Sequence, residues 1–87
     1  MTTDDRICMV LDAHAKLREP AATLSDTREL AGVGMSSHAS VNVMLALEDA
    51  FDIEFPADLL TKQTFGTIGA IRAAVASLQV RQTEIAS

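Results

Sequence analysis

Apolar residues recur near the N-terminus at intervals that an α-helix brings to one side: Ile7, Val10 and Leu11. Thr2, with Asp5 three residues later, gives the sequence pattern of a capping box at a helix start. Pro20 closes the segment, because the residue before a proline avoids the α region. We therefore expect a first helix from about Asp4 to Leu17.

The most hydrophobic segment of the chain is predicted to form a second helix, which begins at Ser36 or Ser37 and ends near Phe51. A serine at the first position accepts a hydrogen bond from a backbone N–H group that has no helical partner. The apolar residues cover more of the helix than one narrow stripe: Val41, Val43, Met44, Leu45 and Leu47. Such a helix is either central in the fold or keeps an exposed apolar side.

Two further helices are predicted in the last third of the chain. Pro56 is a favoured first residue for a short helix that carries Leu59 and Leu60. Thr67 is a suitable N-cap for a last helix, whose apolar residues follow at helical spacing: Ile68, Ile71, Val75 and Leu78. The polar tail over residues 79–87 is expected to be frayed.

The segment between the first two helices, from Arg18 to Ser36, is long for a loop in a small domain. Side chains that reach the core must hold it, and its apolar residues are Leu24, Leu30, Val33 and Met35. The pattern thus predicts an all-α fold, a small bundle of three main helices plus one short helix with this long loop. At 87 residues, the chain suffices for a single domain over residues 1–87 and is too short for two.

The composition supports helices and gives no sign of export. The chain is 48% hydrophobic but has no Trp or Tyr and only three Phe, so its core must rely on aliphatic residues. A single cysteine, Cys8, excludes an internal disulfide. The acidic start MTTDD does not resemble a signal peptide, and no apolar run approaches membrane-spanning length. We therefore expect a soluble, cytoplasmic protein.

The charge is negative and unevenly distributed. The net charge is −5, and no Lys or Arg lies between Arg28 and Lys62. The acidic residues in that interval are Glu29, Glu48, Asp49, Asp52, Glu54 and Asp58. Such a surface repels nucleic acid and anionic membranes, so we expect the protein to bind neither. It attracts partners with basic patches. We also expect a monomer. A solvated face that only confers solubility explains the same pattern, and both interpretations stay open.

No residue pattern indicates catalysis or a metal site. His14 and His38 are far apart, and Cys8 has no second thiol nearby. Ser37 and His38 are adjacent, and adjacent residues on a helix point about 100° apart, so this pair does not form a nucleophile and base. No Gly-x-Ser-x-Gly segment surrounds the serine. We expect no enzymatic activity, and from these residues alone Ser36 and Ser37 serve as helix caps.

The segment GMSSHASVNVMLALEDAFDIEFP, residues 34–56, resembles the centre of acyl carrier proteins. In that family a Gly-x-Asp-Ser-Leu segment precedes an apolar helix, which ends in acidic residues, a Phe, a short acidic turn and a Pro. Counting back from LEDAFDIEFP places Ser37 at the serine that the family modifies.

The resemblance implies an acyl-carrier-like helical bundle with a covalent 4′-phosphopantetheine arm on Ser37. A phosphopantetheinyl transferase attaches this arm from coenzyme A. The thiol of the arm holds a cargo as a thioester, and tethering raises the effective concentration of the cargo at successive enzymes. The resemblance thus implies a phosphoprotein that performs no chemistry of its own.

Several residues depart from the carriers of fatty-acid synthesis. Ser36 and His38 stand where the family usually has Asp and Leu, and Ala39 and Asn42 stand where acidic residues are common. The Gly-Met-Ser-Ser-His-Ala-Ser-Val pattern is more similar to bacterial aminoacyl carrier proteins, which a ligase resembling a truncated seryl-tRNA synthetase loads with an amino acid. The resemblance implies an aminoacyl cargo, an amino acid:carrier protein ligase and a downstream acceptor enzyme. Fatty-acyl or polyketide-type cargo is the alternative.

Candidate partner contacts surround the predicted attachment serine: Ser36, His38, Val41, Asn42, Leu45, Glu48 and Asp49. His38, Val41 and Leu45 follow at helical spacing, so they are predicted to form an apolar docking strip. The competing interpretation places His38 over the loop and the two apolar residues in the core. A second function also stays open, that of an unmodified acidic adaptor that binds a basic partner through Glu48 and Asp49.

Overall fold

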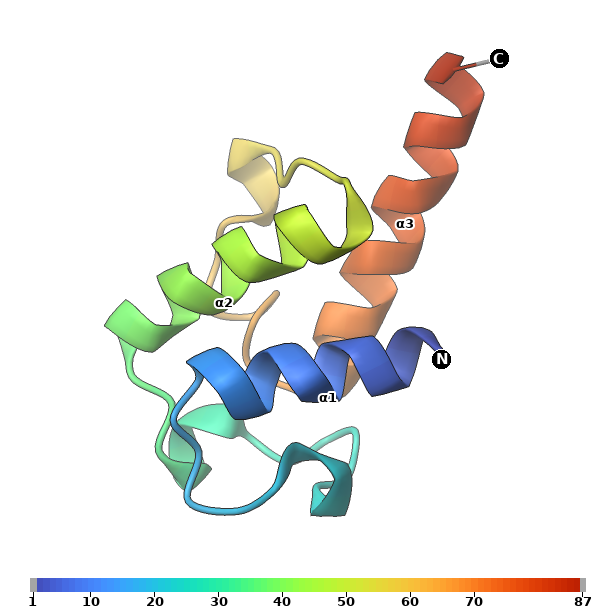
Figure 1. Cartoon of the computed structure of the whole chain (residues 1–87). Helices are drawn as coiled ribbons and strands as arrows, with labels where there is room; N and C mark the ends of the chain where they lie inside the picture. The colour runs from blue at the N-terminus through green and yellow to red at the C-terminus, as the bar shows by residue number, and fades with distance from the viewer. Residues whose placement is uncertain (1, 87) are drawn as a thin grey trace.

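The computed structural model describes residues 2–86, and the side chains of residues 2–80 (Figure 1). The α-helices are α1 (Thr3–His14), α2 (Ser37–Phe51) and α3 (Ile68–Ala86). The short 3-10 helices are η1 (Ala21–Thr23), η2 (Leu30–Val33) and η3 (Ala57–Leu59). Residues 2–86 contain no β-strand, and the prediction of an all-α fold is confirmed. The short helix expected after Pro56 is the 3-10 helix η3.

α1 begins with the predicted capping box. The Thr2 hydroxyl accepts a hydrogen bond from the Asp5 N–H, and the Asp5 carboxylate accepts one from the Thr2 N–H. Two N–H groups at the helix start are therefore satisfied by side chains. The helix buries the face that its apolar spacing indicates, with Ile7, Val10 and Leu11 in the core.

α1 ends earlier than the sequence predicts, at His14 rather than Leu17. Lys16 adopts a left-handed backbone conformation with a φ of 56°, which stops the helix. Two residues on, the Arg18 N–H donates to the Val33 carbonyl oxygen at 2.8 Å, so the chain is already turned against the end of the loop. Pro20 sets only the furthest position that α1 could reach. The turn at Lys16 and the bond from Arg18 to Val33 end the helix before that position.

The loop between α1 and α2 is held to the core by the predicted side chains. Leu30, Val33 and Met35 are buried, whereas Leu24 is only half-buried. The Leu30 N–H also donates to the Gly66 carbonyl oxygen at 2.8 Å, which joins the loop to the start of α3. Gly34 has a φ of 113°, a conformation that favours glycine, and it directs the chain into α2. The buried loop side chains, the bond from Leu30 to Gly66 and the turn at Gly34 together fix the position of the α2 N-terminus.

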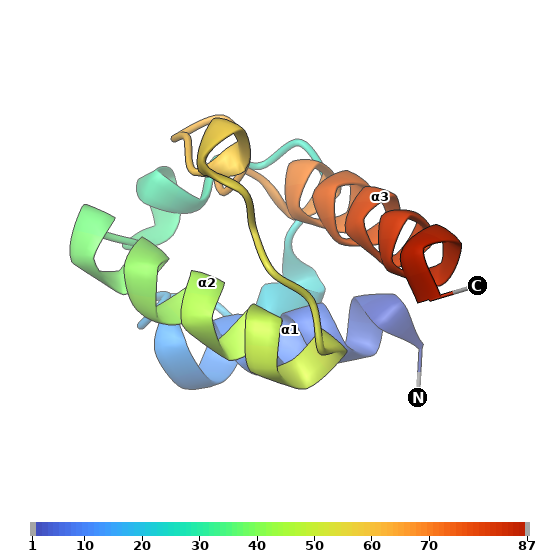
Figure 2. The ribbon, with the colours of Figure 1, turned by 90° about the horizontal axis from the view of Figure 1, so that it is seen from above.

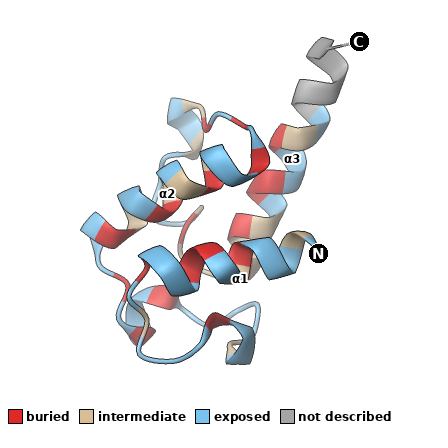
Figure 3. Cartoon of the chain, viewed as in Figure 1, coloured by how far each residue is buried: buried red, intermediate tan, exposed pale blue. Residues whose placement is uncertain are grey.

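The core lies between the three helices, and α2 contributes every fourth residue to it (Figure 3). Those residues are Ala39, Val43, Leu47 and Phe51. They pack with the fully buried residues of the neighbouring elements, among them Ile7, Leu11, Ile71 and Val75. α1 and α2 run in opposite directions side by side (Figure 1). α2 therefore presents one face to the core and leaves the opposite face outside.

After α2 the chain returns across the molecule to η3 and then to α3 (Figure 2). Asp52 ends α2 in a left-handed conformation with a φ of 53°, and Ile53 and Phe55 then enter the core. The ring of Phe55 meets that of Phe65 in a T-shaped arrangement, with centroids 5.2 Å apart. This aromatic pair fixes the segment with η3 beside the first half of α2.

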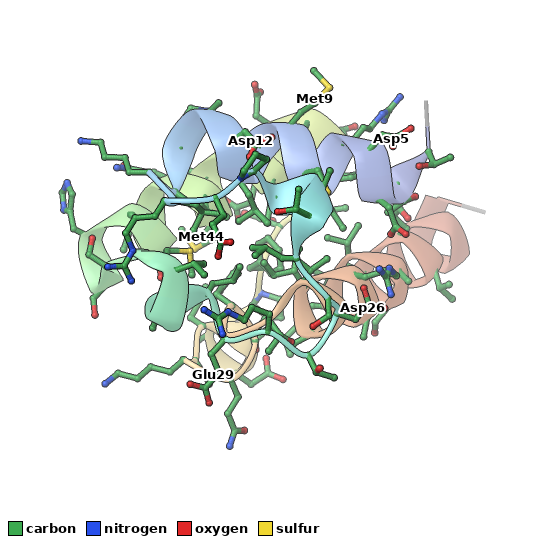
Figure 4. The ribbon with its side chains drawn as sticks, turned by 90° about the horizontal axis from the view of Figure 1, so that it is seen from below. Asp5, Met9, Asp12, Asp26, Glu29 and Met44 are labelled. Atoms are coloured by element: carbon green, nitrogen blue, oxygen red, sulfur yellow. The ribbon has the colours of Figure 1, made fainter. Side chains whose placement is uncertain are left out.

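A charged cluster joins three distant parts of the chain. Arg72 of α3 donates two hydrogen bonds of 2.8 Å to the Asp26 carboxylate in the loop, and a third to Asp4 of α1. The Gly69 N–H also donates to the Asp26 carbonyl oxygen at 3.1 Å. Figure 4 shows Asp26 beside α3. The cluster therefore supports the loop without taking part in the surface near Ser37.

The backbone of α3 is helical through Ala86. The side chains from residue 81 onward lie outside the described residues, so the expected fraying of residues 79–87 stays a prediction. Among the described residues, no helix combines the length and apolar character that crossing a membrane requires.

Candidate functional site

The two serines at the start of α2 have different roles. The Ser36 hydroxyl accepts the Ala39 N–H at 3.1 Å, and its carbonyl oxygen accepts the Ser40 N–H at 2.9 Å, so Ser36 is the N-cap. Ser37 is the first helical residue and is exposed. Its hydroxyl makes no hydrogen bond to any other residue in the described range. Capping thus explains Ser36 and leaves Ser37 unexplained.

An open, mostly apolar hollow lies directly beside Ser37. Its volume is about 340 Å³, and it separates the first half of α2 from the segment after η3. From α2 it is lined by Ser37, Ser40, Val41 and Met44, and from the facing segment by Leu60, Thr61, Lys62 and Phe65. Figure 4 shows Met44 directed into the molecule, whereas Met9 of α1 points away from it. The Ser37 hydroxyl is therefore at the edge of a concave surface.

The outward face of α2 carries exposed apolar side chains. Val41 and Leu45 are 52% and 53% exposed, which excludes the interpretation that they pack in the core. His38 is exposed as well, and its position near Val41 and Leu45 follows from helical spacing. We call Ser37, His38, Val41 and Leu45 the outer ridge of α2. The ridge therefore combines the exposed side chains of Val41 and Leu45 with the Ser37 hydroxyl, which makes no hydrogen bond within the described residues.

Two other predicted contact residues lie toward α1. Asn42 and Asp49 are exposed and line a second hollow of about 520 Å³ between α1 and α2. The same hollow is lined by Val10 and His14 of α1 and by Leu45, Ala46 and Ala50 of α2. Leu45 borders this hollow, whereas Val41 borders the one beside Ser37. The predicted contact residues therefore lie around one helix, on the ridge and on its α1 side.

Glu48 has a structural partner that sequence reasoning missed. Its side chain is half-buried, and one carboxylate oxygen accepts the Phe55 N–H at 2.9 Å. A carboxylate that accepts a backbone N–H forms one of the stronger hydrogen bonds in proteins. Glu48 therefore holds the segment after α2, whereas the neighbouring Asp49 is exposed and has no hydrogen bond or ion pair within the described residues.

Sequence reasoning also missed the segment that faces Ser37 across the hollow, residues 60–65. Leu60 is 49% exposed and Lys62 is exposed, and both border the hollow. A signal was present in the sequence, because Lys62 is the one Lys or Arg between Arg28 and Arg72. The adjacent pair Leu59 and Leu60 also offers more apolar surface than a short helix can bury, and only Leu59 packs against the core.

One argument from the sequence needs correction. The absence of an acidic residue at position 39 was used, with positions 36 and 42, to distinguish the chain from carriers of fatty-acid synthesis. Ala39 is buried at 5% exposure, so a small apolar residue is needed there for packing. The surface argument rests on Ser36 and Asn42 alone.

Cys8 is half-buried on α1 and packs against the core. Burial raises the pKa of its thiol, and the carboxylates of Asp12, Asp4 and Asp5 raise it further. A thiol with a raised pKa is a poor nucleophile at neutral pH. Within the described residues, no group of three or more His, Cys, Asp or Glu side chains is placed to hold a metal ion.

Residues 12–75, well over half of the chain, match the phosphopantetheine attachment site family. The chain belongs to this family. Membership implies a covalently attached phosphopantetheine group, and the exposed, unbonded hydroxyl of Ser37 at a helix N-terminus fits its attachment.

Known carrier proteins are similar to this chain in sequence and in fold. The aminoacyl carrier protein of Agrobacterium fabrum is 45% identical over 62 residues, which cover 71% of this chain and 75% of that protein. A carrier protein from Agrobacterium tumefaciens, crystallised with an engineered glycine:carrier protein ligase from Bradyrhizobium japonicum and ATP, is 39% identical with a TM-score of 0.83. That match covers 87% of this chain and 99% of the other.

The corresponding complex with AMP matches at 40% identity and a TM-score of 0.81, over 85% of this chain and 99% of the other. A solution structure of an Agrobacterium tumefaciens protein matches at 36% identity and a TM-score of 0.72, over 94% and 99%. The chain is thus a small all-α carrier protein whose known relatives include aminoacyl carriers.

Proposed function

We propose that the chain is an aminoacyl carrier protein with Ser37 as the attachment point of its 4′-phosphopantetheine arm. The observation that carries this proposal is the difference between the two serines. Ser36 caps the helix, whereas Ser37 is exposed and its hydroxyl makes no hydrogen bond within the described residues. When bound, the arm supplies the thiol that holds the cargo as a thioester.

The start of α2 suits a phosphodiester. The N–H groups of Ser37 and His38 make no hydrogen bond within the described residues, because the Ser36 hydroxyl is bonded to Ala39. These free N–H groups and the helix dipole favour an anion by about 0.3–1 kcal/mol at an exposed site. In the transferase reaction the Ser37 oxygen would bond to the phosphorus of coenzyme A that carries the pantetheine. The pyrophosphate bond would break, adenosine 3′,5′-bisphosphate would leave, and the hydroxyl proton would be released.

Three observations favour an aminoacyl cargo over a fatty-acyl one. Sequence identity of 45% links the chain to an aminoacyl carrier protein, and close structural relatives are bound to a glycine:carrier protein ligase. Ser36 and Asn42 replace acids with neutral side chains near the attachment point. The hollow beside Ser37 is open to solvent, and an amino acid with a charged amine has little reason to leave water.

The outer ridge of α2 is the surface we assign to the amino acid:carrier protein ligase. Its exposed Val41 and Leu45 offer apolar area on the same face as the arm, and His38 lies between them and Ser37. A few well-packed residues near the centre of an interface carry most of its binding energy. Asp49, on the α1 side, adds a negative charge that attracts a basic partner and sets the encounter rate.

Intact mass spectrometry tests the attachment. We expect incubation with coenzyme A and a broad-specificity transferase to add one phosphopantetheine mass to the wild type and none to Ser37→Ala. Ser36→Ala is the matched control, and it should still be modified although its helix cap is weakened. Addition of the arm to the Ser37→Ala variant would refute the assignment.

Loading tests the cargo and separates the alternatives. The arm-bearing protein is offered to an amino acid ligase with ATP, and in parallel to an acyl-carrier synthetase with a fatty acid. We expect loading by the ligase, and preferential fatty acylation would favour the conventional acyl carrier. An unmodified adaptor would instead keep its activity in Ser37→Ala and lose it on charge reversal at Asp49.

A further inference from the structure

Among the described residues, Lys62 is the one charged residue that lines the hollow beside Ser37. It lies on the segment after η3, across the hollow from the first turn of α2. Its side chain is exposed, and no ion pair or hydrogen bond engages it within the described residues. A lysine with no partner within the described residues therefore borders the same hollow as Ser37.

Other cations near the start of α2 are placed differently. The guanidinium of Arg18 donates to the Gly32 carbonyl oxygen at 2.7 Å and is committed to the loop. Lys16 is exposed near Gly34, but it does not line the hollow. Of these three cations, Lys62 is thus the one that borders the apolar hollow beside Ser37.

A phosphodiester on the Ser37 oxygen carries one negative charge at neutral pH, and its covalent bond confines it to the same edge of the hollow. An ammonium group and a phosphate oxygen form a charge-assisted hydrogen bond when they meet. A pair of this kind points the next atoms of the arm across the hollow. Without it, the arm is equally free to extend over the outer ridge of α2.

We propose that Lys62 is a positioning residue for the arm, whose ammonium group pairs with the phosphodiester on Ser37 and holds the root of the arm over the hollow. The proposal rests on attachment of the arm at Ser37. The surface beneath the arm is formed by Met44 and Leu60, whose apolar side chains match the methyl and methylene groups of the arm. His38 and Leu45 of the outer ridge, which do not line this hollow, then stay uncovered for the ligase.

Paramagnetic relaxation enhancement in the arm-bearing protein measures this placement. Cys8→Ser removes the protein's own thiol, intact mass confirms the arm, and a nitroxide is attached to the thiol of the arm. We expect stronger broadening of the amide signals of Leu60 and Met44 than of Leu45. In Lys62→Gln the difference should disappear, in Lys62→Arg it should persist, and high salt should reduce it because exposed ion pairs are screened.

Lys16→Gln is the matched control, because it removes the same charge from the other lysine of the chain. It should leave the broadening pattern unchanged. An unchanged pattern in Lys62→Gln would overturn the proposal, and so would a failure of Lys62→Gln alone to accept the arm, which would assign Lys62 to the transferase. Absence of the arm from the parent protein would instead refute the attachment at Ser37, so the two failures are distinguishable.

Discussion

The outward residues of α2 up to Leu45 differ in role from Glu48 and the helix end that follow. In the segment up to Leu45, Val41 and Leu45 are about half exposed and the Ser37 hydroxyl has no hydrogen-bond partner within the described residues. Beyond it, Glu48 is bonded to Phe55, and Asp52 ends the helix before two residues that enter the core. The segment up to Leu45 is thus open to other molecules, whereas Glu48 and Asp52 hold the fold. Acidic residues near a helix end therefore differ in role even when they are adjacent.

The largest effect should follow a change in the segment up to Leu45. Leu45→Asp places a charge at the centre of the proposed ligase surface, where an anchor residue contributes about 2 kcal/mol of binding free energy. We expect kcat/KM of the ligase for the carrier to fall about 30-fold, with the free energy of unfolding changed by less than about 0.5 kcal/mol.

The control for Leu45→Asp is Val80→Asp on α3, which alters another exposed apolar residue far from the ridge. It should leave ligase kinetics unchanged. Equal losses in the two variants would mean that overall charge, and not the ridge, determines recognition.

A change at Glu48 should affect stability instead. Glu48→Ala removes the acceptor of the Phe55 N–H and should lower the free energy of unfolding by about 1–2 kcal/mol, measured by urea denaturation. Glu48→Gln keeps an acceptor oxygen and should lose less. Asp49→Asn removes a neighbouring charge that has no hydrogen-bond or ion-pair partner within the described residues, so it should be nearly neutral in stability. If Asp49→Asn destabilised the protein as much as Glu48→Ala, the bond from Glu48 to Phe55 would not be the cause of the loss.

The smallest effect concerns the charged cluster that supports the loop before α2. Hydrogen bonds from Arg72 hold the pKa of Asp26 below its ordinary value of about 3.9, so the ionised form is favoured in the folded state. The stabilisation is fully present above the ordinary pKa and is lost as the pH falls through the lowered one. Urea denaturation of the wild type and Asp26→Asn should differ slightly at pH 7 and converge at acid pH. A difference that persists below the lowered pKa would show that charge is not its cause.

The spacing of apolar residues sufficed to predict the three main helices, because residues that share the buried face of a helix recur every three or four positions. It failed at the end of α1, since the bond between Arg18 and Val33 spans residues that local rules do not connect. The resemblance predicts Ser37 as the attachment serine, and this stays a prediction. The structure adds that Ser36 caps the helix, whereas the Ser37 hydroxyl has no partner within the described residues. Lys62 and Leu60 were missed because they meet Ser37 through the fold and not along the chain.

The raised pKa of the Cys8 thiol has a chemical consequence for a protein that transports activated groups. A sulfur that ionised readily at neutral pH would exchange with any thioester that reached it, which would move the cargo to Cys8 and release the thiol of the arm. Half-burial and three nearby carboxylates favour the protonated form of this sulfur, and so slow that exchange.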